Sequence, residues 1–419
     1  MNYRIAYVTY VMYQPVSQEM QAEAQEVGQT YARLRQRFFD RGFIFADSFV
    51  DGMNALGNET LHILYDVEAL QKLWAKENGV AFRQHWWKRD IAIAQLQRFR
   101  PDVVFIQSPN PDSLINLVPD SEFRELCPTV RLAAASSGYP QGPEAVRSID
   151  LLFAGSRAIR AHYQQGGADA QLMYHAFDER IISQLAAYRS GGNGAAGFRD
   201  FTFLGSTGCG FGETHRHRYF DLVHLLAGTP LEIWGFEPVR QQPSLAAPEV
   251  FASAAAALQM LMKSVSPSAF ASIYRHILQD CRGSDIPTIP LATLFPDRCH
   301  APLFGMSMYD HMERSYLTFN RHADASGGDV GNMRMFHATG LGTCLLTDDG
   351  ENISELFEPN KEVVVYNSVE DCLDKALYLL AHPGEREAIA TAGHRRAMRD
   401  HTYRQRCAMI HHAIVRALH

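Results

Sequence analysis

The sequence of 419 residues predicts an α/β protein with two doubly wound domains, and three observations support this fold class. Short apolar runs rich in β-branched residues alternate with longer helical stretches, which is typical of a parallel sheet covered by helices on both faces. The segment SGGNGAAG at residues 190–197 contains mostly small residues without periodicity and indicates a flexible linker. Because the alternation of strands and helices restarts after this segment, we expect a second sheet.

The first domain is expected to span residues 1–188. The run RIAYVTY at residues 4–10 is predicted to be a buried first strand, and a long helical pattern follows at about residues 17–39. Helices are also expected in ALQKLWAKENG and WWKRDIAIAQLQRF. Further strands are predicted for DVVFIQS, VRLAAAS and IDLLFAGS, at residues 102–108, 130–136 and 149–156.

The linker is placed at residues 189–198, and the second domain is expected at residues 199–400, with a helical insertion near residues 245–300. The chain ends in helices, and the last of them, at residues 401–419, could pack back on the first domain. Strands of the second domain are predicted for FTFL, LEIWG, YLTFN, TCLLT and EVVVY, at residues 201–204, 231–235, 316–320, 343–347 and 362–366.

The charge balance disfavours a dedicated nucleic-acid-binding protein. Lys and Arg total 39 and Asp and Glu total 46, which gives 39 − 46 = −7. Nucleic-acid binders usually carry a basic footprint instead. We therefore expect no nucleic-acid partner, although a local basic pocket for a phosphate is compatible with this charge.

Cysteine usage and hydropathy predict a cytoplasmic protein. The seven cysteines are scattered and form no C-x-x-C pair, so neither a zinc site nor a redox dithiol is indicated. The first residues do not have the pattern of a signal peptide. No window reaches the roughly 18 apolar residues that a membrane-spanning helix needs, so we expect at most peripheral membrane contact.

A glycine-rich turn follows the predicted strand FTFL directly. The segment GSTGCGFGETHRHR runs from Gly205 to Arg218 and leads into a helix. Glycines let backbone N–H groups approach an anion, and a helix N-terminus adds positive potential, to which Arg216 and Arg218 can add charge-assisted hydrogen bonds. The segment matches neither the Walker loop nor the dinucleotide-binding fingerprint. It is a candidate phosphate-binding loop, and the alternative is a mobile surface turn.

A second candidate anion site lies at the start of the helix that follows Gly331. Asn332 and Arg334 fall at its first turn, where backbone N–H groups and a guanidinium would converge on one anion. The alternative is that Asn332 caps the helix and that Arg334 is solvated. The strand TCLLT comes after this helix and would place Thr347 and Asp348 at the same edge of the sheet.

Three further residues are candidates for the site. Asn320 and His322, at the end of YLTFN, would face the same edge, although a single histidine is more often a structural residue. In the first domain Asp112 follows a strand and could act as a general base towards a hydroxyl acceptor, while capping of the next helix explains it equally well. No D-x-D pair and no H-E-x-x-H motif occurs, so we expect no essential metal and no cofactor.

Several blocks of the C-terminal half resemble CgeB-like bacterial glycosyltransferases. The resemblance implies the glycosyltransferase-B fold, in which two Rossmann-like domains face each other across a cleft. The matching blocks lie within residues 303–406, in the family's order, and FTFLGS matches less strongly: SYLTFNRH, GNMRMFHATGLGTCLLTD, ELFEPNKEVVVYNSVEDC and YLLAHPGEREAIATAGHRRAMRDHTYRQR.

The same resemblance implies metal-independent transfer of a sugar from a nucleotide-sugar donor to a hydroxyl-bearing acceptor, in bacterial glycan or glycoconjugate synthesis. The acceptor would be a glycan, a lipid-linked glycan or a protein, bound by the N-terminal domain, while the C-terminal domain binds the donor. By position, Gly205 and Ser206 would lie beside the donor phosphates, and Asn332 and Arg334 at the diphosphate-binding helix. Gly340, near the end of that helix, completes the expected donor-binding residues.

His337 is expected at the donor but departs from the family pattern. Related sequences have Phe-Glu-Ala where this chain has Phe336-His337-Ala338, and that glutamate would hold donor hydroxyls. The larger group has an earlier glutamate in an E-x7-E pattern, and we assign that place to Val330, so that both carboxylates are missing. An imidazole cannot hold a diol bidentately as a carboxylate does. A catalytically silent nucleotide-sugar-binding scaffold, and an epimerase or hydrolase on the same fold, are therefore alternatives to a glycosyltransferase.

Overall fold

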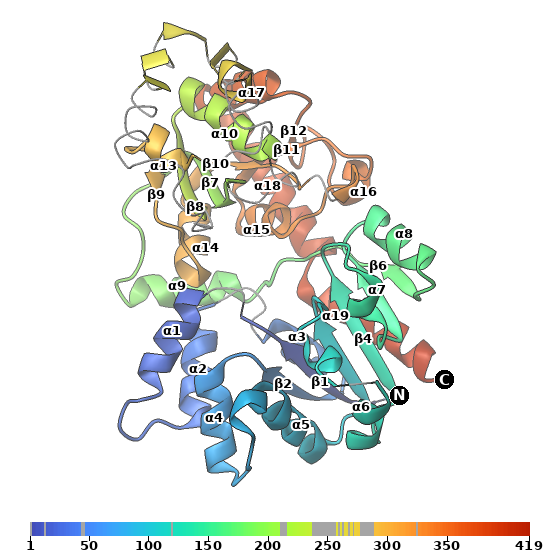
Figure 1. The fold of residues 1–419 in the computed structure, drawn as a ribbon. Helices are drawn as coiled ribbons and strands as arrows, with labels where there is room; N and C mark the ends of the chain where they lie inside the picture. The colour runs from blue at the N-terminus through green and yellow to red at the C-terminus, as the bar shows by residue number, and fades with distance from the viewer. Residues whose placement is uncertain are drawn as a thin grey trace. The chain divides into compact units, whose positions relative to one another are not determined.

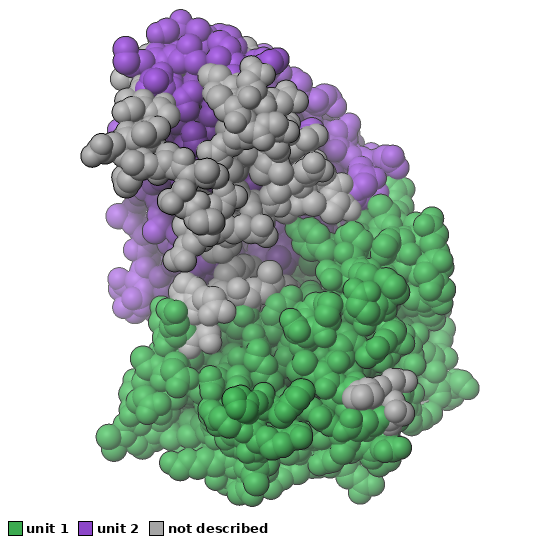
Figure 2. Space-filling view, viewed as in Figure 1, with its two compact units in different colours: residues 1–178, 401–419 green, residues 179–400 purple. Residues whose placement is uncertain are grey.

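The computed structural model divides the chain into two compact units (Figures 1 and 2). The first unit comprises residues 1–178 and 401–419, and the second comprises residues 179–400. Each unit contains one six-stranded sheet, and all its strand pairs are parallel. The structure describes residues 2–11, 14–42, 47–118, 120–209, 216–236, 257–258, 260–261, 264–266, 269–270, 272–276, 289–323 and 326–419.

The sheet of the first unit has the strand order β2-β1-β3-β4-β5-β6. The order reverses between β1 and β3, and ligands of such sheets bind in the crevice outside the carboxyl ends of the strands at this point. The strands are β1 Arg4–Thr9, β2 Glu59–Leu64, β3 Val103–Gln107, β4 Leu132–Ser137, β5 Leu151–Ala154 and β6 Ala170–Leu172. The helices are α1 Gln14–Glu23, α2 Tyr31–Asp40, α3 Ser48–Ala55, α4 Glu68–Glu77, α5 Trp87–Phe99, α6 Asp120–Leu126, α7 Pro143–Val146, α8 Arg157–Gln165 and α19 Tyr403–Leu418, with 3-10 turns η1 Gln84–Trp86 and η2 Leu114–Asn116.

Helices cover both faces of this first sheet. Alternate strand residues such as Ala6 and Val8 pack in one core with Leu96 of α5 and Ile159 of α8. The residues between them, such as Tyr7, pack in a second core that includes α3 and the C-terminal helix α19. The last helix of the chain therefore belongs to the first unit, where it covers one face of the sheet.

The sheet of the second unit has the order β12-β11-β10-β7-β8-β9, and its reversal point lies between β7 and β10. The strands are β7 Arg199–Ser206, β8 Leu231–Phe236, β9 Cys299–His300, β10 Ser315–Asn320, β11 Cys344–Asp348 and β12 Val364–Tyr366. The helices are α9 Ile181–Ser190, α10 Arg216–Gly228, α13 Leu291–Leu294, α14 Gly305–Glu313, α15 Met333–Leu341, α16 Ile353–Leu356, α17 Val369–Ala381 and α18 Pro383–Asp400.

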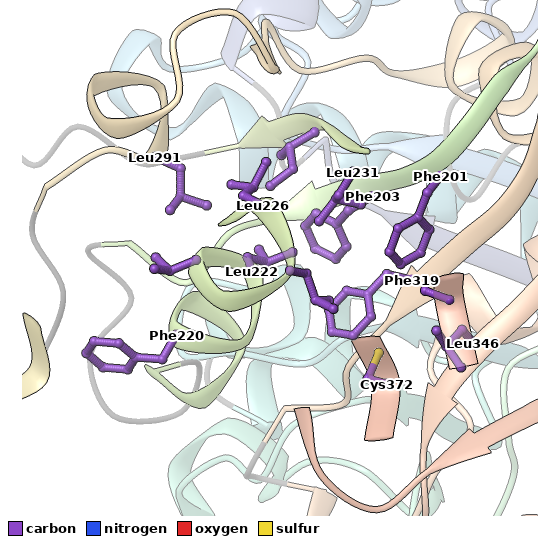
Figure 3. Close-up of a cluster of buried hydrophobic side chains, with 14 of the residues drawn as sticks. Phe201, Phe203, Phe220, Leu222, Leu226, Leu231, Leu291, Phe319, Leu346 and Cys372 are labelled. Atoms are coloured by element: carbon purple, nitrogen blue, oxygen red, sulfur yellow. The ribbon is translucent and has the colours of Figure 1, made fainter. Parts of the chain in front are cut away.

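The main core of the second unit lies between the sheet and the helices α10 and α17 (Figure 3). Phe201 and Phe203 of β7 point to this face together with Phe319 of β10, and Leu222 of α10 and Cys372 of α17 pack against them. Helices α14, α15 and α18 contact the sheet as well, and α15 contacts both other helices. This core fixes the strands β7 and β10, whose ends carry the candidate site.

The predicted fold class is confirmed, while several elements differ from the expectation. The expected helix at residues 17–39 is two helices, α1 and α2, because Gly28 adopts a left-handed φ of 75° and Thr30 caps a new helix through the N–H of Arg33. The strands β2, β6 and β9 were not expected. Most of the helical insertion expected near residues 245–300 lies outside the described residues.

The segment at residues 189–198, expected to be a linker, belongs to the second unit. Asp310 of α14 attaches it at two points. Its carboxylate accepts hydrogen bonds from Nε of Arg189 at 2.5 Å and from the N–H of Ala195 at 2.6 Å. Because Asp310 is only 1% exposed, these contacts replace water around a buried charge. The boundary between the units therefore falls earlier, between Asp178 and Glu179.

Candidate functional site

The carboxyl ends of β7 and β10 bring two of the expected donor-binding residues together. Gly205 near the end of β7 has a φ of 147°, and a β-carbon at this position would lie 2.7 Å from Cζ of Arg334 and overlap its guanidinium. The Arg334 guanidinium also lies 5.1 Å from the ring centroid of Phe203 in the same strand. Only glycine leaves space for this cation above the strand end, so the arginine of α15 is held at the reversal point of the sheet.

Five polar residues form a closed ring of hydrogen bonds beside this arginine. Asn332 Nδ2 donates to Asn320 Oδ1 at 2.9 Å, and Asn320 Nδ2 donates to Thr347 Oγ1 at 3.0 Å. Thr347 Oγ1 donates to Asp348 Oδ1 at 3.3 Å, and His322 Nδ1 donates to the same oxygen at 2.7 Å. The backbone N–H of Asn332 donates to His322 Nε2 at 3.2 Å and closes the ring. The ring ties the start of α15 to the ends of β10 and β11.

His322 occupies the backbone N–H groups in front of α15. Its Nε2 accepts hydrogen bonds from the N–H groups of Gly331 at 2.9 Å and of Asn332 at 3.2 Å, which requires the tautomer protonated on Nδ1. The side chain of Asn332 caps the helix by accepting from the N–H of Met335. An anion at this helix end would therefore meet the guanidinium of Arg334 and the positive helix end, rather than these two N–H groups.

Arg218 lies in the same region, and its side chain forms hydrogen bonds to backbone carbonyls of the protein. Its side chain is buried, with 7% exposure, and it donates to the carbonyl of Arg321 at 2.6 and 3.2 Å and to the carbonyl of Ser206 at 3.3 Å. The guanidinium therefore links the segment after β10 to the last residue of β7. The part of the expected glycine-rich loop between Cys209 and Arg216 lies outside the described residues.

A charged cluster that was not expected from the sequence adjoins the ring. Arg321 lies between two carboxylates, with 3.5 Å from its Nε to Oδ2 of Asp221 and 3.8 Å from its Nη1 to Oδ2 of Asp348. Burial raises the pKa of Asp221 to about 7, although Arg321 lowers it in part. Burial also raises the pKa of Asp348, but the contacts with His322 and the charge of Arg321 outweigh this, so its pKa lies below the ordinary value.

His337 lies one turn after Arg334 in α15 and is 7% exposed. Its ring packs edge-on against Tyr309 of α14, with centroids 5.1 Å apart and an interplanar angle of 82°. The assignment of the earlier family position to Val330 was wrong, because the spacing E-x7-E leads back from 337 to 337 − 8 = 329. That residue is Asp329, a buried carboxylate with 4% exposure. One carboxylate of the pair that the resemblance implies is therefore present.

Two expected site residues take no part in the contacts of this cluster. Gly340 is in the last turn of α15, about 9 Å along the helix from Arg334, and its carbonyl accepts a hydrogen bond from His394 of α18. Asp112 is an exposed residue after β3 in the first unit, where its N–H donates to Asn110 Oδ1 and its carbonyl accepts from the hydroxyl of Tyr65.

Among the described residues, no group of three or more His, Cys, Asp or Glu side chains is arranged to hold a metal ion. In the same part of the chain, no helix has both the length and the apolar composition needed to cross a membrane.

Comparison with known structures places the fold among glycosyltransferases. AviGT4, a glycosyltransferase involved in avilamycin A biosynthesis, is 16% identical, with a TM-score of 0.51 and coverage of 99% of this chain and 98% of that chain. Anabaena Alr3699/HepE in complex with UDP is 10% identical, with a TM-score of 0.53 and coverage of 98% and 99%. Sucrose-phosphate synthase from Thermosynechococcus elongatus is 9% identical, with a TM-score of 0.50 and coverage of 99% and 98%.

At these identities the similarity establishes the fold, and the predicted glycosyltransferase-B type is confirmed. A comparison with curated protein sequences finds no match. Residues 282–412 match the family described as glycosyl transferase-like, and this segment contains β10, α15, β11 and the ring of hydrogen bonds. The C-terminal part of the chain is therefore similar to the glycosyl transferase-like family over these residues.

Proposed function

We propose that this protein is a glycosyltransferase that moves a sugar from a nucleotide-sugar donor to a hydroxyl-bearing acceptor, without a metal. The observation that carries the proposal is the contact of Arg334 with Gly205 at the reversal point of the second sheet, inside the fold of the glycosyltransferases. Two structures of similar fold are Alr3699/HepE complexes, one with UDP and one with UDP-glucose, which supports a nucleoside diphosphate as the leaving group.

The proposed chemistry follows from the charge that develops during transfer. As the bond between the sugar and the diphosphate breaks, negative charge accumulates on the leaving phosphate, and a pre-positioned guanidinium lowers the energy of that state. Arg334 would supply this charge beside the backbone of Gly205 and Ser206. The ring of five hydrogen-bonded residues, which includes Asn320 and Thr347, would hold α15 in one orientation and so position the side chain of Arg334. Asp329 and His337 occupy the first and last positions of the E-x7-E pattern, and both would face the donor.

We propose that the acceptor is a bacterial glycan, a lipid-linked glycan or a protein. The enzyme is proposed to be CgeB-like and to act in the cytoplasm. One structure of similar fold is an α-glucosyltransferase with UDP-glucose and DNA. The net charge of −7 in the present chain argues against a nucleic-acid acceptor.

A catalytically silent donor-binding protein is the second candidate, and His337 is the observation that favours it. This imidazole stands where the family has a carboxylate, and it packs on Tyr309 in a buried position. A carboxylate can accept two hydrogen bonds from a sugar diol, whereas a neutral imidazole accepts one.

The experiment that tests the proposal incubates the full chain with UDP-, GDP- and dTDP-sugars, with and without glycoside acceptors, and measures the release of nucleoside diphosphate. Release that increases when an acceptor is added supports the transferase. Stabilisation of the protein against heat by a nucleotide sugar, with no release in any combination, would support the silent binding protein instead.

A further inference from the structure

His322 connects the end of β11 to the turn that precedes α15. On one side its Nδ1 donates to Oδ1 of Asp348 at 2.7 Å, and its backbone N–H donates to both oxygens of the same carboxylate, at 3.1 and 3.0 Å. On the other side its Nε2 accepts from the N–H groups of Gly331 and Asn332. The residue is buried. Because Asp348 holds both the main chain and the ring, the imidazole is fixed against the two N–H groups.

The turn at residues 328–332 is held from a second side as well. The fully buried Asn352 accepts from the N–H of Val330 at 2.7 Å and donates to the carbonyl of the same residue at 2.8 Å. Gly350 packs closely beside it, since a β-carbon there would lie 2.5 Å from Cγ1 of Val330. Neither of these contacts changes with pH. The hydrogen bonds to His322 differ from them, because they require an imidazole nitrogen without a proton.

A protonated His322 cannot hold the turn. The neutral imidazole has an acceptor at Nε2, whereas an imidazolium has an N–H at both nitrogens. Its Nε2–H would point at the N–H groups of Gly331 and Asn332, so two hydrogen bonds would be lost and three N–H groups would face one another. The ion pair with Asp348 would become stronger at the same time. Protonation would therefore leave the ring on β11 and push the turn away.

A movement of the turn reaches Arg334 over a short path. Asn332 caps α15 by accepting from the N–H of Met335, and Arg334 is the second residue of this helix. The guanidinium lies against Gly205 and the ring of Phe203. A shift of the first turn of α15 would withdraw the cation from this position, and a misplacement of about 1 Å can reduce a rate about 100-fold.

We propose that His322 is a positioning residue and that its protonation switches the donor site off. The inference rests on the proposed function, because it concerns the regulation of the proposed donor site. The neutral imidazole holds the turn so that Arg334 faces the diphosphate, and the imidazolium releases the turn. Since imidazole groups change their charge between about pH 5 and pH 8, donor affinity should decrease in this range as the pH falls.

The groups around His322 come from several elements, and one of them also titrates near neutral pH. Burial raises the pKa of Asp348, but the contacts with His322 and the charge of Arg321 hold it below the ordinary value, so this carboxylate stays charged. Burial raises the pKa of Asp221 on α10, which pairs with Arg321, to about 7. Its effect must therefore be separated from that of His322. Other charged or titratable side chains on the neighbouring segments are Arg218, Asp329, Arg334, Asp349, Glu351 and Tyr366.

The test measures the affinity of the full chain for UDP-, GDP- and dTDP-glucose by calorimetry between pH 5.5 and pH 8.5. Nucleotide sugars are suitable probes, because both of their phosphates are diesters and lack the second phosphate ionisation near about pH 6. The wild-type chain should bind its preferred nucleotide sugar at least about 10-fold more weakly at pH 5.5 than at pH 8, since a hydrogen-bonded charge contributes at least that much to affinity.

Two amide replacements separate the two sides of the imidazole. Glutamine can place its carbonyl oxygen near the position of Nε2 and does not titrate, so His322→Gln should bind within about threefold of wild type at pH 8 and keep that affinity at pH 5.5. Asparagine can place its amide only near the position of Nδ1, beside Asp348, so His322→Asn should bind weakly at both pH values. Melting temperatures show whether each variant is folded, and the comparison with His322→Gln decides even where His322→Asn does not fold.

Two further variants serve as controls. The exposed His412→Gln in the first unit should follow the wild-type pH dependence. Asp221→Asn should also keep this dependence, and its loss there would assign the switch to Asp221 instead of His322.

The outcomes separate the switch from the transferase. Release of nucleoside diphosphate together with a pH-independent affinity, or a wild-type pH dependence that persists in His322→Gln, would overturn the switch and leave the transferase intact. The expected pH dependence without release in any combination would overturn the transferase and leave the switch in a donor-binding protein. A wild-type chain that neither binds nor cleaves any of these sugars at any pH would overturn both proposals.

Discussion

The guanidinium of Arg334 occupies the space that a side chain at Gly205 would need. These residues come from the first turn of α15 and the end of β7, and the contact joins the two segments that the sequence predicts to be anion sites. Arg334 also lies over the ring of Phe203, two residues earlier in the same strand, so an aromatic ring and the bare backbone of the glycine together set its position.

Replacement of Gly205 by alanine should therefore displace Arg334 and reduce donor turnover. The added methyl group overlaps the guanidinium, and the φ of 147° is unfavourable for alanine, so a loss of about 2–4 kcal/mol in stability is expected by chemical denaturation. Gly167→Ala is the control, because Gly167 has a φ of 83° but no heavy atom within 4 Å of an added β-carbon.

The double variant Gly205→Ala with Arg334→Ala separates the two causes. Removing the guanidinium should restore about 1 kcal/mol of the lost stability while activity stays low. Equal stability losses in the single and double variants would show that the contact with Arg334 contributes nothing.

Replacement of Asp348 by asparagine should destabilise the protein in a pH-dependent way. The carboxylate accepts from the backbone and the ring of His322, and its pKa is below the ordinary value of about 3.9. Its stabilising effect is therefore complete above that ordinary value and is lost as the pH falls through the lower folded value. Denaturation at pH 7 should show a loss of about 2–3 kcal/mol that shrinks below pH 4. The exposed Asp200→Asn should change stability little, and a pH-independent loss in Asp348→Asn would contradict the linkage.

Replacement of Asp221 by asparagine should have the opposite effect and stabilise the protein. Burial raises its pKa to about 7, so the folded state binds a proton that the unfolded state has already released above about pH 4. The cost of its charge appears as the pH rises from about 4 to 7 and is complete above pH 7. Asp221→Asn should therefore be more stable than wild type by about 1–2 kcal/mol at pH 8 and equal to it below pH 4. A melting temperature at pH 8 below that of both wild type and the exposed control Asp297→Asn would show that the ion pair with Arg321 dominates instead.

Replacement of Arg218 by alanine should act through stability before it acts through donor binding. Its guanidinium donates three hydrogen bonds to the carbonyls of Ser206 and Arg321, and the side chain is buried. We expect a loss of about 2–4 kcal/mol in the free energy of unfolding, because two partly buried carbonyls lose their donors and the buried side chain loses its packing. A variant as stable as wild type but defective in donor binding would identify Arg218 as a direct ligand contact.

The fold was predictable because the central parallel strands are continuous apolar runs. VVFIQ in β3 and CLLTD in β11 are buried along their length and form apolar runs in the sequence. The edge strand β2, ETLHIL, has a partly exposed polar start, and β9 has only two residues, so neither gives a periodic signal.

The members of the candidate site were predictable, while their contacts were not. Asn320, Asn332, Thr347 and Asp348 were expected at one sheet edge because polar residues at the ends of parallel strands meet there, and the structure brings them together. Which of them bond to one another depends on strand register, which aligns Asn320 with Thr347. Asp221 was not expected because it lies within an ordinary helical pattern, and only the tertiary fold brings it to Arg321.

The most direct test of the proposed donor site is the rate of nucleoside diphosphate release by Arg334→Ala at saturating nucleotide sugar and acceptor. The expected result is a loss of about 100-fold or more relative to wild type, since the positioned cation beside the leaving group is removed. The melting temperature should stay within about 2 °C of wild type, and Arg395→Ala, an exposed arginine of α18, should retain wild-type rates. Release by Arg334→Ala within twofold of the wild-type rate would contradict the assignment of the donor site to α15 and β7.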